Sequence, residues 1–210
     1  MINSENIKFS KKPWPYLEID NFLSEEHLVK LIEIAKKAPA VNDKLEHNYS
    51  AVKNNTVLRK SNVLDDSFLL ELNKEYTHKI LGCLKFFNSW KRLFFNFAEI
   101  NLQVSGPNFP SKIHLDSPKK IATAIVYIYS KEPYVGTALY NKNCDLESKQ
   151  EISWKVNKAV IFSRTNYSHH TGLSNGTSKR VVLVFNLKTE KSGIVKNIDR
   201  VKDFFVKPFV

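Results

Sequence analysis

A histidine and an aspartate stand two positions apart in residues 112–118, which read KIHLDSP. We expect a strand here, and side chains at positions i and i+2 of a strand point to the same face. The imidazole of His114 and the carboxylate of Asp116 can then meet at one point. Fe(II) accepts these two ligand types, and a second histidine would complete a 2-His-1-carboxylate facial triad. On its own, the pair also fits a surface ion pair at a strand end.

Candidates for the second histidine lie further along the chain. Residues 168–172 read SHHTG and supply His169 and His170. Arg180 follows them and opens an apolar stretch, VVLVF, which is typical of a buried strand. A basic residue in that place also fits a charge at a sheet edge.

The composition describes a chain that can build a sizeable core. It has 210 residues, of which 42% are hydrophobic and 12% aromatic, and this length favours a single domain. Lys and Arg number 32 against 21 Asp and Glu, so the formal net charge of +11 favours an anionic partner. The basic residues are scattered singly or in pairs, and we therefore do not expect nucleic acid to be that partner.

Cysteine use and hydropathy bear on the compartment. The two cysteines, Cys83 and Cys144, have no CxxC spacing and do not suggest a disulfide framework. No apolar segment resembles a signal peptide or a membrane span. We therefore expect a reducing, cytoplasmic setting without membrane contact.

The first half of the chain predicts a short strand followed by helices. Residues 16–20 alternate as a strand does, Ser24 is a good N-cap for a helix that closes at Pro39, and residues 66–87 carry apolar side chains at helical spacing. We expect both helices to buttress a sheet. Residues 40–65 are polar and irregular, and we expect them to form a flap that shapes selectivity.

From residue 93 the pattern changes to short strands. The expected strands are residues 93–104, 112–115, 121–129, 137–140, 153–156, 159–163 and 180–187. Turn signals at Gly106-Pro107, Glu132-Pro133 and Asn175-Gly176 separate them. Short strands after a helical start favour an antiparallel sandwich or barrel flanked by helices. We expect residues 193–210 to pack back onto the sheet or to make a dimer contact.

Taken in order, these pieces resemble the 2-oxoglutarate- and Fe(II)-dependent dioxygenases, and within them the prolyl 4-hydroxylase-like branch. That family carries His-x-Asp, then a distal histidine, then a basic residue a short distance further on. Arg180 lies ten positions after His170 and eleven after His169, so both histidines fit. Similar flanking stretches are residues 14–24, 114–120, 124–128, 136–140 and 157–163, so the resemblance spans about residues 14–187. One departure is Val135-Gly136, where the family has a Gly-Gly pair.

The resemblance implies a mainly β fold of the α+β class. Its core would be a double-stranded β-helix, the jelly roll that cupins share, with buttressing helices before it. In this single domain, residues 1–210, the helical lead-in would span about 24–90, the core about 93–187 and a C-terminal extension 188–210.

The resemblance also implies the metal ligands. His114, Asp116 and one of the two later histidines would bind Fe(II) and so act as the catalytic centre. We prefer His170, because family members often carry Ser-aromatic-His here and residues 168–170 fit that triplet with His169 in the aromatic place. His169 remains the alternative ligand.

Two residues would bind the cosubstrate in this interpretation. Arg180 would hold the far carboxylate of 2-oxoglutarate, since a planar guanidinium can donate two parallel hydrogen bonds. Tyr127 stands where some relatives place a hydroxyl on the same carboxylate. It equally fits a core tyrosine whose hydroxyl is satisfied elsewhere.

The implied reaction couples oxidative decarboxylation of 2-oxoglutarate to a hydroxylation, with O2 as second cosubstrate and ascorbate as a supporting reductant. The substrate would be a peptidyl prolyl, another protein residue or a small molecule, and the protein a monomer or homodimer. The alternative is a cupin-type protein with another metal, or a jelly-roll binding protein without catalysis. Cupins normally use His-x-His with a glutamate, whereas this chain has Asp116.

Further polar residues are assigned by context. The histidines expected at the surface are His27, His47 and His78. The residues that could face the pocket from neighbouring strands are Asn101, Gln103 and Tyr140. Lys119 and Lys120 fit solvated turn residues, or cations that attract an anionic cosubstrate or substrate.

Overall fold

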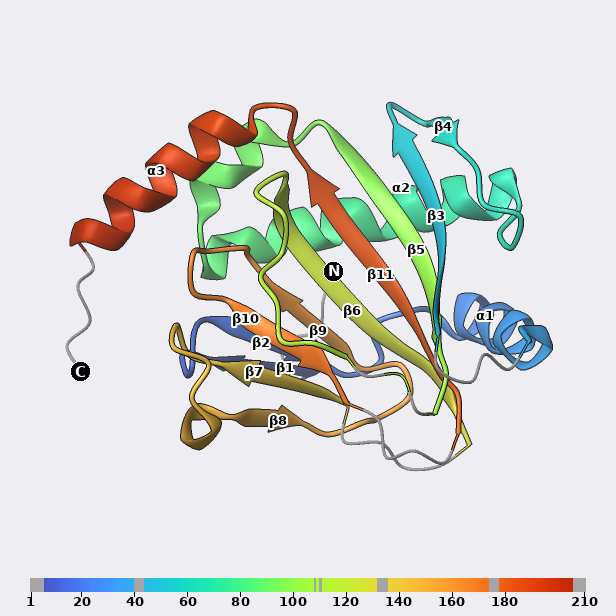
Figure 1. Cartoon of the computed structure of the whole chain (residues 1–210). Coiled ribbons are helices and arrows are strands. Elements are labelled where there is room, and N and C mark those ends of the chain that lie inside the picture. The colour runs from blue at the N-terminus through green and yellow to red at the C-terminus, as the bar shows by residue number, and fades with distance from the viewer. Residues whose placement is uncertain are drawn as a thin grey trace.

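The fold is mainly β, with two antiparallel sheets face to face and helices on the outer side of the larger one (Figure 1). The computed structural model describes residues 6–39, 44–107, 109, 111–131, 136–173 and 178–205, and the side chains among them as far as residue 201. The prediction of an α+β jelly roll with buttressing helices is confirmed.

The larger sheet holds strands from both ends of the chain. Its order is β1-β2-β9-β6-β11-β5-β3-β4, and all neighbouring strands are antiparallel. The bounds are β1 (Ile7–Ser10), β2 (Tyr16–Ile19), β9 (Ala159–Phe162), β6 (Lys120–Ser130), β11 (Arg180–Lys188), β5 (Phe97–Ser105), β3 (Leu45–Lys53) and β4 (Thr56–Arg59).

The smaller sheet has the order β10-β7-β8 and is built from β10 (His169–Gly172), β7 (Thr137–Tyr140) and β8 (Gln150–Ile152). His114 joins the open edge of β10 by an isolated bridge. After β5 the chain visits this sheet at His114, the larger sheet in β6, the smaller one in β7 and β8, and then β9, β10 and β11 in alternation. Such alternation between two facing sheets is a double-stranded β-helix.

The two long helices begin where a side chain caps them. α1 (Glu25–Lys37) follows Ser24, whose hydroxyl accepts a hydrogen bond from a backbone N–H of the first turn. α2 (Asp66–Cys83) follows Asp65, whose carboxylate does the same at 2.8 Å. Both starts agree with the sequence prediction. The other helical segments are η2 (Leu84–Phe86), η3 (Ser89–Phe94), η4 (Leu146–Ser148) and α3 (Ser192–Phe205).

Strand β11 separates two apolar cores. Its side chains on one face pack with α2, which crosses behind the larger sheet (Figure 1); they are Val181, Leu183, Phe185 and Leu187. Val182 and Val184 face the smaller sheet and pack with Trp14 and Phe162. Because successive side chains of a strand point to opposite faces, one buried strand contributes to both cores.

The expectation of an irregular flap at residues 40–65 is wrong for its described part. Residues 44–65 include β3 and β4, which form a hairpin at one edge of the larger sheet. Both turn residues, Asn54 and Asn55, have positive φ, at 48° and 59°, which is the conformation that asparagine favours in two-residue hairpins. The strands are only partly buried, so their polar composition concealed them. Residues 40–43 lie outside the described residues.

Two further expected strands differ in the structure. Residues 112–115 form no strand apart from the His114 bridge, and the strand expected at 153–156 lies at Gln150–Ile152 instead. Beyond Ile152, Trp154 stacks on Tyr127, with ring centroids 4.6 Å apart. The expected turns at Glu132-Pro133 and Asn175-Gly176, and Val135 of the Val135-Gly136 pair, lie outside the described residues.

The C-terminal segment, which we expected to pack back onto the sheet or to make a dimer contact, forms the helix α3. In α3, Val195 is buried, and the buried carboxylate of Asp199 lies 2.9 Å from the Lys91 ammonium of η3. The expectation of a surface position is wrong for His27. This side chain is buried, and its Nδ1 lies 2.9 Å from the Tyr76 hydroxyl. Residues 206–210 lie outside the described residues.

Glu18 of β2 is a buried carboxylate held between two lysines. The Lys8 ammonium lies 2.9 Å from one carboxylate oxygen, and the Lys158 ammonium lies 2.8 Å from the other. Burial acts to raise the pKa of Glu18, but hydrogen bonds and charge from Lys158 and Lys8 outweigh it, and the pKa is lowered. A carboxylate whose pKa is lowered by folding stabilises the protein above its unfolded pKa of about 4.3, and this contribution is lost as pH falls through the folded value.

We expect Glu18→Gln to destabilise the protein at neutral pH by about 1–2 kcal/mol, since two lysines lose a buried charged partner. Thermal unfolding followed by circular dichroism should show a lower Tm at neutral pH and a difference that shrinks below about pH 4. Glu147→Gln, at an exposed glutamate of η4, is the matched control and should leave the Tm unchanged. A loss of stability that persists in acid would contradict this account.

Candidate metal centre

Three side chains with metal-binding atoms converge on one side of the smaller sheet. The ligand atoms of His114, Asp116 and His170 all lie within 4.8 Å of one another. The backbones of His114 and His170 exchange two hydrogen bonds of 3.1 Å, which sets the two imidazoles side by side with ring centroids 4.5 Å apart. Asp116 and His170 are buried, whereas His114 is exposed. The described residues contain no other cluster of this kind.

The expected strand geometry is not what brings His114 and Asp116 together. Only His114 pairs with the smaller sheet, and the chain then crosses toward β6 of the larger sheet, where Asp116 lies. The carboxylate therefore approaches from the opposite sheet rather than from the next position on one strand face. The convergence predicted from the sequence is found, but its structural cause is different.

Both histidines present the same ring nitrogen to the centre. Nδ1 of His114 lies 3.0 Å from the Lys112 carbonyl oxygen, and Nδ1 of His170 lies 3.2 Å from that of Ser168. A carbonyl only accepts hydrogen bonds, so each Nδ1 carries the proton and each Nε2 keeps its lone pair. Burial lowers the pKa of His170 to about 4, so this ring is neutral near pH 7. Neutral imidazole is the form that binds metals.

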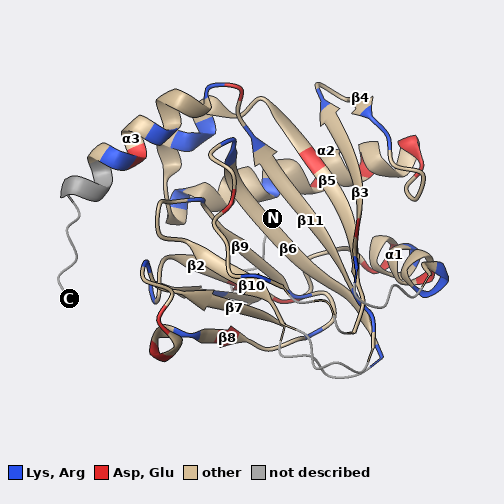
Figure 2. Ribbon diagram, viewed as in Figure 1, with Lys and Arg blue, Asp and Glu red and all other residues tan. Residues whose placement is uncertain are grey.

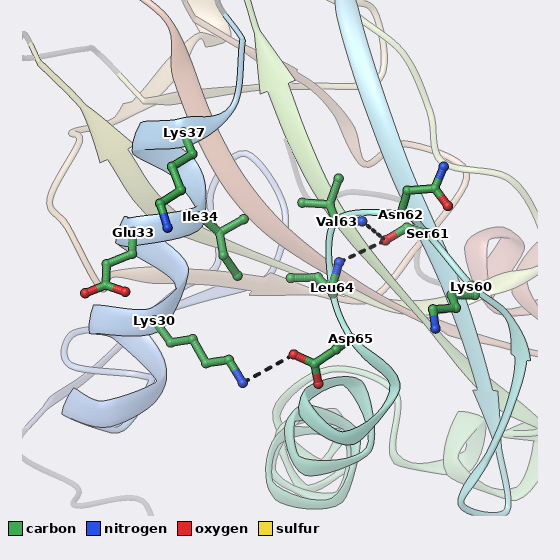
Figure 3. Close-up of a pocket in the computed structure, with 10 residues that line it drawn as sticks. All are labelled: Lys30, Glu33, Ile34, Lys37, Lys60, Ser61, Asn62, Val63, Leu64 and Asp65. Atoms are coloured by element: carbon green, nitrogen blue, oxygen red, sulfur yellow. Dashed lines mark hydrogen bonds and ion pairs between the residues drawn. The ribbon is translucent and has the colours of Figure 1, made fainter.

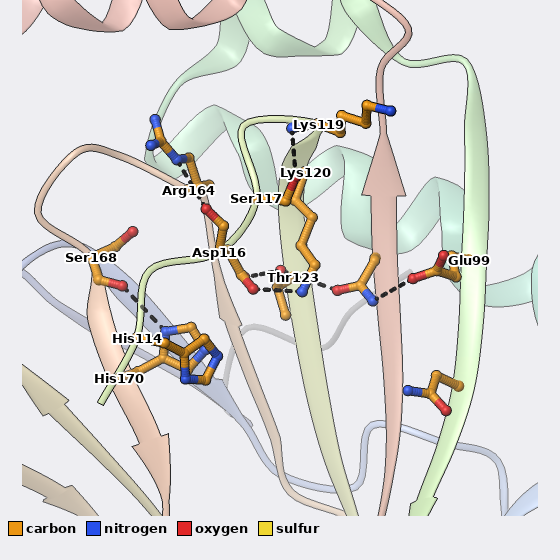
Figure 4. A network of polar contacts seen from close by, with 12 residues as sticks. Glu99, His114, Asp116, Ser117, Lys119, Lys120, Thr123, Arg164, Ser168 and His170 are labelled. Carbon is orange, nitrogen blue, oxygen red and sulfur yellow. Dashed lines mark hydrogen bonds and ion pairs between the residues drawn. The ribbon is translucent and has the colours of Figure 1, made fainter. Parts of the chain in front are cut away.

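Asp116 is held as a carboxylate by two donors (Figure 4). The Lys120 ammonium lies 2.5 Å from Oδ1, and the Thr123 hydroxyl donates to Oδ2 at 2.7 Å. Burial acts to raise the pKa of Asp116, but the charges of Lys120 and His170 and the two hydrogen bonds lower it to about 2. Arg164 donates to the Asp116 carbonyl oxygen at 3.4 Å and so fixes the backbone.

The neighbouring histidine, His169, has a different environment. It precedes His170 on β10, so its side chain points to the opposite face of the smaller sheet, and it is not part of the three-residue cluster. Its Nδ1 is buried and has no hydrogen-bond partner within the described part of the chain. The position of His170 is the one that agrees with our preferred ligand set.

A cavity of about 680 Å³ opens beside the three residues. It lies between the two sheets, and its described lining is Leu45, His47, Tyr49, Gln103, Ser105, Phe109, Ser111, Lys112, His114, Leu115, Asp116, Ser117, Lys120, Thr123, Ile125, Thr137, His170, Gly172, Leu173, Arg180, Val182 and Val184. Its size is in the range that small-molecule sites occupy. Arg180 and Gln103 therefore face the cavity, as the sequence suggested.

The guanidinium of Arg180 is buried at the start of β11. It lies over the rings of Tyr127 and Trp154, with its central carbon 5.8 Å and 5.7 Å from their centroids. A Cβ at Gly172 would lie 2.8 Å from an Arg180 nitrogen, so a larger residue there would displace the guanidinium from this position.

Tyr127 does not line the cavity. It is fully buried, and its hydroxyl donates to Thr137 Oγ1 at 2.9 Å. Burial raises the pKa of Tyr127 to about 12, so the hydroxyl stays protonated. Because Thr137 accepts from Tyr127, its own O–H is free to donate, and Thr137 does line the cavity. Thr137 has no sequence signal beyond its place in an expected strand.

The opposite wall of the cavity contains residues that sequence reasoning assigned elsewhere. His47, expected as an ordinary surface residue, is exposed at the cavity wall, and its ring stacks on Tyr49 at 4.8 Å. Asn101 is fully buried behind it, with Nδ2 3.0 Å from His47 Nδ1. Tyr140 is buried and absent from the described lining. Side chains at positions i and i+2 of a strand share a face, so a strand over residues 45–53 places His47 and Tyr49 side by side.

A second cavity of about 450 Å³ lies between α1 and the segment before α2 (Figure 3). Lys30 pairs with Asp65 across it at 3.5 Å, and the Ser61 hydroxyl accepts hydrogen bonds from the backbone N–H groups of Val63 and Leu64. Its described lining contains no histidine or cysteine. Its described lining therefore offers none of the imidazole ligands that the first cavity has.

The basic residues do not gather on one element. Lys and Arg lie on strands, helices and loops throughout the described chain (Figure 2), which accounts for the net charge of +11 without a single basic segment. None of the described helices combines the length and apolar character that crossing a membrane requires.

Solved structures share this fold. The chain is similar to a crystal structure of IDO from Bacillus thuringiensis, with a TM-score of 0.56 at 18% identity over 84% of this chain and 93% of that one. A prolyl-4-hydroxylase from Pseudomonas putida gives 0.52 at 11% identity over 83% and 92%, and JOX2 in complex with 2OG, Fe and JA gives 0.58 at 10% identity over 83% and 68%. No protein-family model and no curated protein matches the sequence.

The chemistry of the three ligand atoms fits a divalent first-row metal. Two neutral imidazoles and one carboxylate on one side of the ion are the donor set of non-haem Fe(II) sites, and Mn(II) or Co(II) can occupy the same set. The pKa values of His170 and Asp116 are both lowered, to about 4 and about 2. Near pH 7 neither side chain has to lose a proton in order to bind a metal ion.

We expect His170→Ala to weaken Mn(II) binding at least about tenfold, because it removes one of three protein ligands. His169→Ala is the matched control, since it deletes a histidine from the adjacent position whose side chain points away from the cluster. Isothermal titration of both variants measures the difference. Equal losses of affinity in the two variants, or a loss only in His169→Ala, would contradict this assignment.

Proposed function

We propose that the chain is a non-haem Fe(II) oxygenase that couples oxidative decarboxylation of 2-oxoglutarate to hydroxylation of a second molecule. The observation that carries this proposal is the meeting of two histidines, one carboxylate and one buried arginine in a single cavity. A fold shared with a structure that contains 2OG and Fe supports it.

His114, Asp116 and His170 would hold the iron on one face and leave its other positions to the cosubstrates. The bound metal would supply the oxidising chemistry with O2 and 2-oxoglutarate. The chain's own residues keep the ligands in the binding form: the Lys112 and Ser168 carbonyls fix the imidazole tautomers, while Thr123 and Lys120 orient the carboxylate.

Arg180 would bind the distal carboxylate of 2-oxoglutarate. Its planar guanidinium suits a carboxylate, and the stacked rings below it and the space at Gly172 hold it in place. In this proposal Thr137 donates its free O–H to the same carboxylate, and Tyr127 acts through Thr137 rather than by direct contact. Val182 and Val184 form an apolar wall that keeps water from this end.

One observation favours a second candidate, a jelly-roll binding protein without catalysis or with another metal, as in cupins. Both oxygens of Asp116 already accept hydrogen bonds, one of them from an ammonium, as they would in a purely structural ion pair. The buried Arg180 facing the same cavity favours the oxygenase, because a structural ion pair does not need it.

The spectroscopic test is anaerobic addition of Fe(II) and 2-oxoglutarate. We expect a weak visible absorption band from charge transfer between the metal and its chelated cosubstrate, and succinate formation once O2 is admitted. His114→Ala should abolish the band, and His78→Ala, which removes an exposed histidine of α2, should preserve it. Absence of the band in the unaltered protein, with metal affinity equal in both variants, would favour the second candidate.

We expect Arg180→Lys to raise the KM for 2-oxoglutarate about tenfold or more, because an ammonium cannot donate the paired hydrogen bonds of a guanidinium. Mn(II) affinity should stay unchanged, since Arg180 is outside the ligand cluster. The readout is succinate formed without added substrate, and the control is Arg92→Lys at an exposed arginine of η3. An unchanged KM would remove Arg180 from the cosubstrate site.

A further inference from the structure

The part of the cavity away from Arg180 has the features of a second binding site. Its wall is formed by β3, which lies two strands from β11 in the larger sheet and hence about 10 Å away. His47 and Tyr49 project from β3 on the cavity side, and His47 lies in register with Gln103 of β5. The Arg180 guanidinium lies over Tyr127 of β6, in the opposite direction. A small dicarboxylate held by Arg180 would therefore leave this wall uncovered.

The charges of the cavity are unbalanced once the proposed ligands are in place. Arg180, Lys112 and Lys120 are the cations of the described lining, and Asp116 is its only carboxylate. With Asp116 on the metal and Arg180 on 2-oxoglutarate, the two lysines face the remaining space without an acid of the cavity to balance them. Glu99 shares its face of β5 with Gln103, but it is absent from the described lining, and its carboxylate pairs with Lys188 at 2.6 Å and accepts from Asn186 at 3.1 Å.

Lys120 can bind a ligand without leaving Asp116. An ammonium has three N–H donors, and Asp116 accepts from one of them. A metal on Asp116 would draw charge away from its carboxylate and so weaken its hold on Lys120. Lys120 lines the cavity, and 20% of its side chain is exposed, so a ligand in the cavity can reach the ammonium.

His47 adds a neutral donor to the same wall. Its Nδ1 lies 3.0 Å from the Asn101 amide nitrogen and 3.4 Å from that of Gln103, so Nδ1 accepts and the ring proton is on Nε2. Both hydrogen bonds of this ring with described residues are made at Nδ1, and the residue is exposed, so Nε2 is left for a ligand. Burial and the charge of Lys120 lower the pKa of His47, which keeps the ring neutral. The stacked Tyr49 ring offers an apolar surface beside this donor.

We propose that the β3–β5 wall binds the substrate of the proposed oxygenase and that this substrate is a small molecule bearing a carboxylate. Lys120 and the Nε2–H of His47 bind the carboxylate, Lys112 attracts it at the cavity mouth, and the Tyr49 ring supports the molecule's apolar part. This inference rests on the proposed function and specifies its substrate class.

The test uses the full chain loaded with Mn(II) and N-oxalylglycine, which fill the metal and cosubstrate sites without turnover. The probes are phenylacetate, hexanoate and 4-methylpentanoate, each beside its primary amide, and an end-blocked proline peptide without charge. Because Mn(II) is paramagnetic, it broadens the proton signals of any probe that binds beside it. Mg(II) in place of Mn(II) gives the diamagnetic reference.

We expect the acids to be broadened and their amides to bind at least about tenfold more weakly, since a charge-assisted hydrogen bond is lost. Lys120→Met should weaken acid binding by a similar factor, and His47→Phe should weaken it while keeping the ring stack. Lys119→Met is the matched control, because the neighbouring lysine is exposed and absent from the described lining. Mn(II) affinity is measured for each variant, so that a change at Asp116 is recognised.

Equal binding of acids and amides, no probe binding at all, or acid binding that survives Lys120→Met would overturn the inference. Broadening of the blocked peptide alone would also overturn it and would identify the wall as a peptide site. If Mn(II) or N-oxalylglycine itself fails to bind, the proposed oxygenase function fails as well. If Mn(II) and N-oxalylglycine bind but acids and amides bind equally, only the proposed substrate class is contradicted.

Discussion

The burial of β11 on both faces is the constraint around which this molecule is arranged. The strand lies in the middle of the larger sheet, and eight of its nine residues are buried. A strand in that position requires apolar cover on each side, which α2 provides on one face and the smaller sheet on the other. The cover ends at Arg180, the first residue of the strand, so a charged group lies at the edge of an otherwise apolar layer.

The candidate centre depends on how far apart the two sheets are held. His114 and His170 belong to the smaller sheet, whereas Asp116 is bound by Thr123 and Lys120 of the larger one. The spacing between them is maintained by aromatic side chains of the core, and Phe162 contacts His170 directly with ring centroids 4.8 Å apart. The packing between the two sheets therefore determines the geometry of the candidate centre.

Much of this arrangement could be predicted from the sequence. Several features depend only on residues close together in the sequence and can therefore be predicted from it. They are the cap residues, the apolar runs of β6, β9 and β11, and the spacing of the histidines and the aspartate. The preference for His170 over His169 came from the resemblance to a family triplet, whereas strand alternation says only that one of two neighbours can face the centre.

The remaining features depend on contacts between distant segments. β3 and β4 are partly exposed and polar, so their alternation is weak, and the signal that marks them is the Asn54-Asn55 turn. The aspartate reaches the centre from the larger sheet because Thr123 and Lys120 are there to bind it, which no spacing within residues 112–118 conveys. The burial of His27 likewise follows from Tyr76, far along the chain.

The single bridge between His114 and His170 has a mechanical consequence. The segment that carries His114 and Asp116 is joined to β10 by two backbone hydrogen bonds at this bridge and by a hydrogen bond from Thr171 to Ser111. An ion bound by both histidines would act as a cross-link between residues that are distant in the sequence, and such a cross-link removes freedom that the open chain would otherwise have. Binding of the ion would then stabilise the folded protein as well as complete the centre.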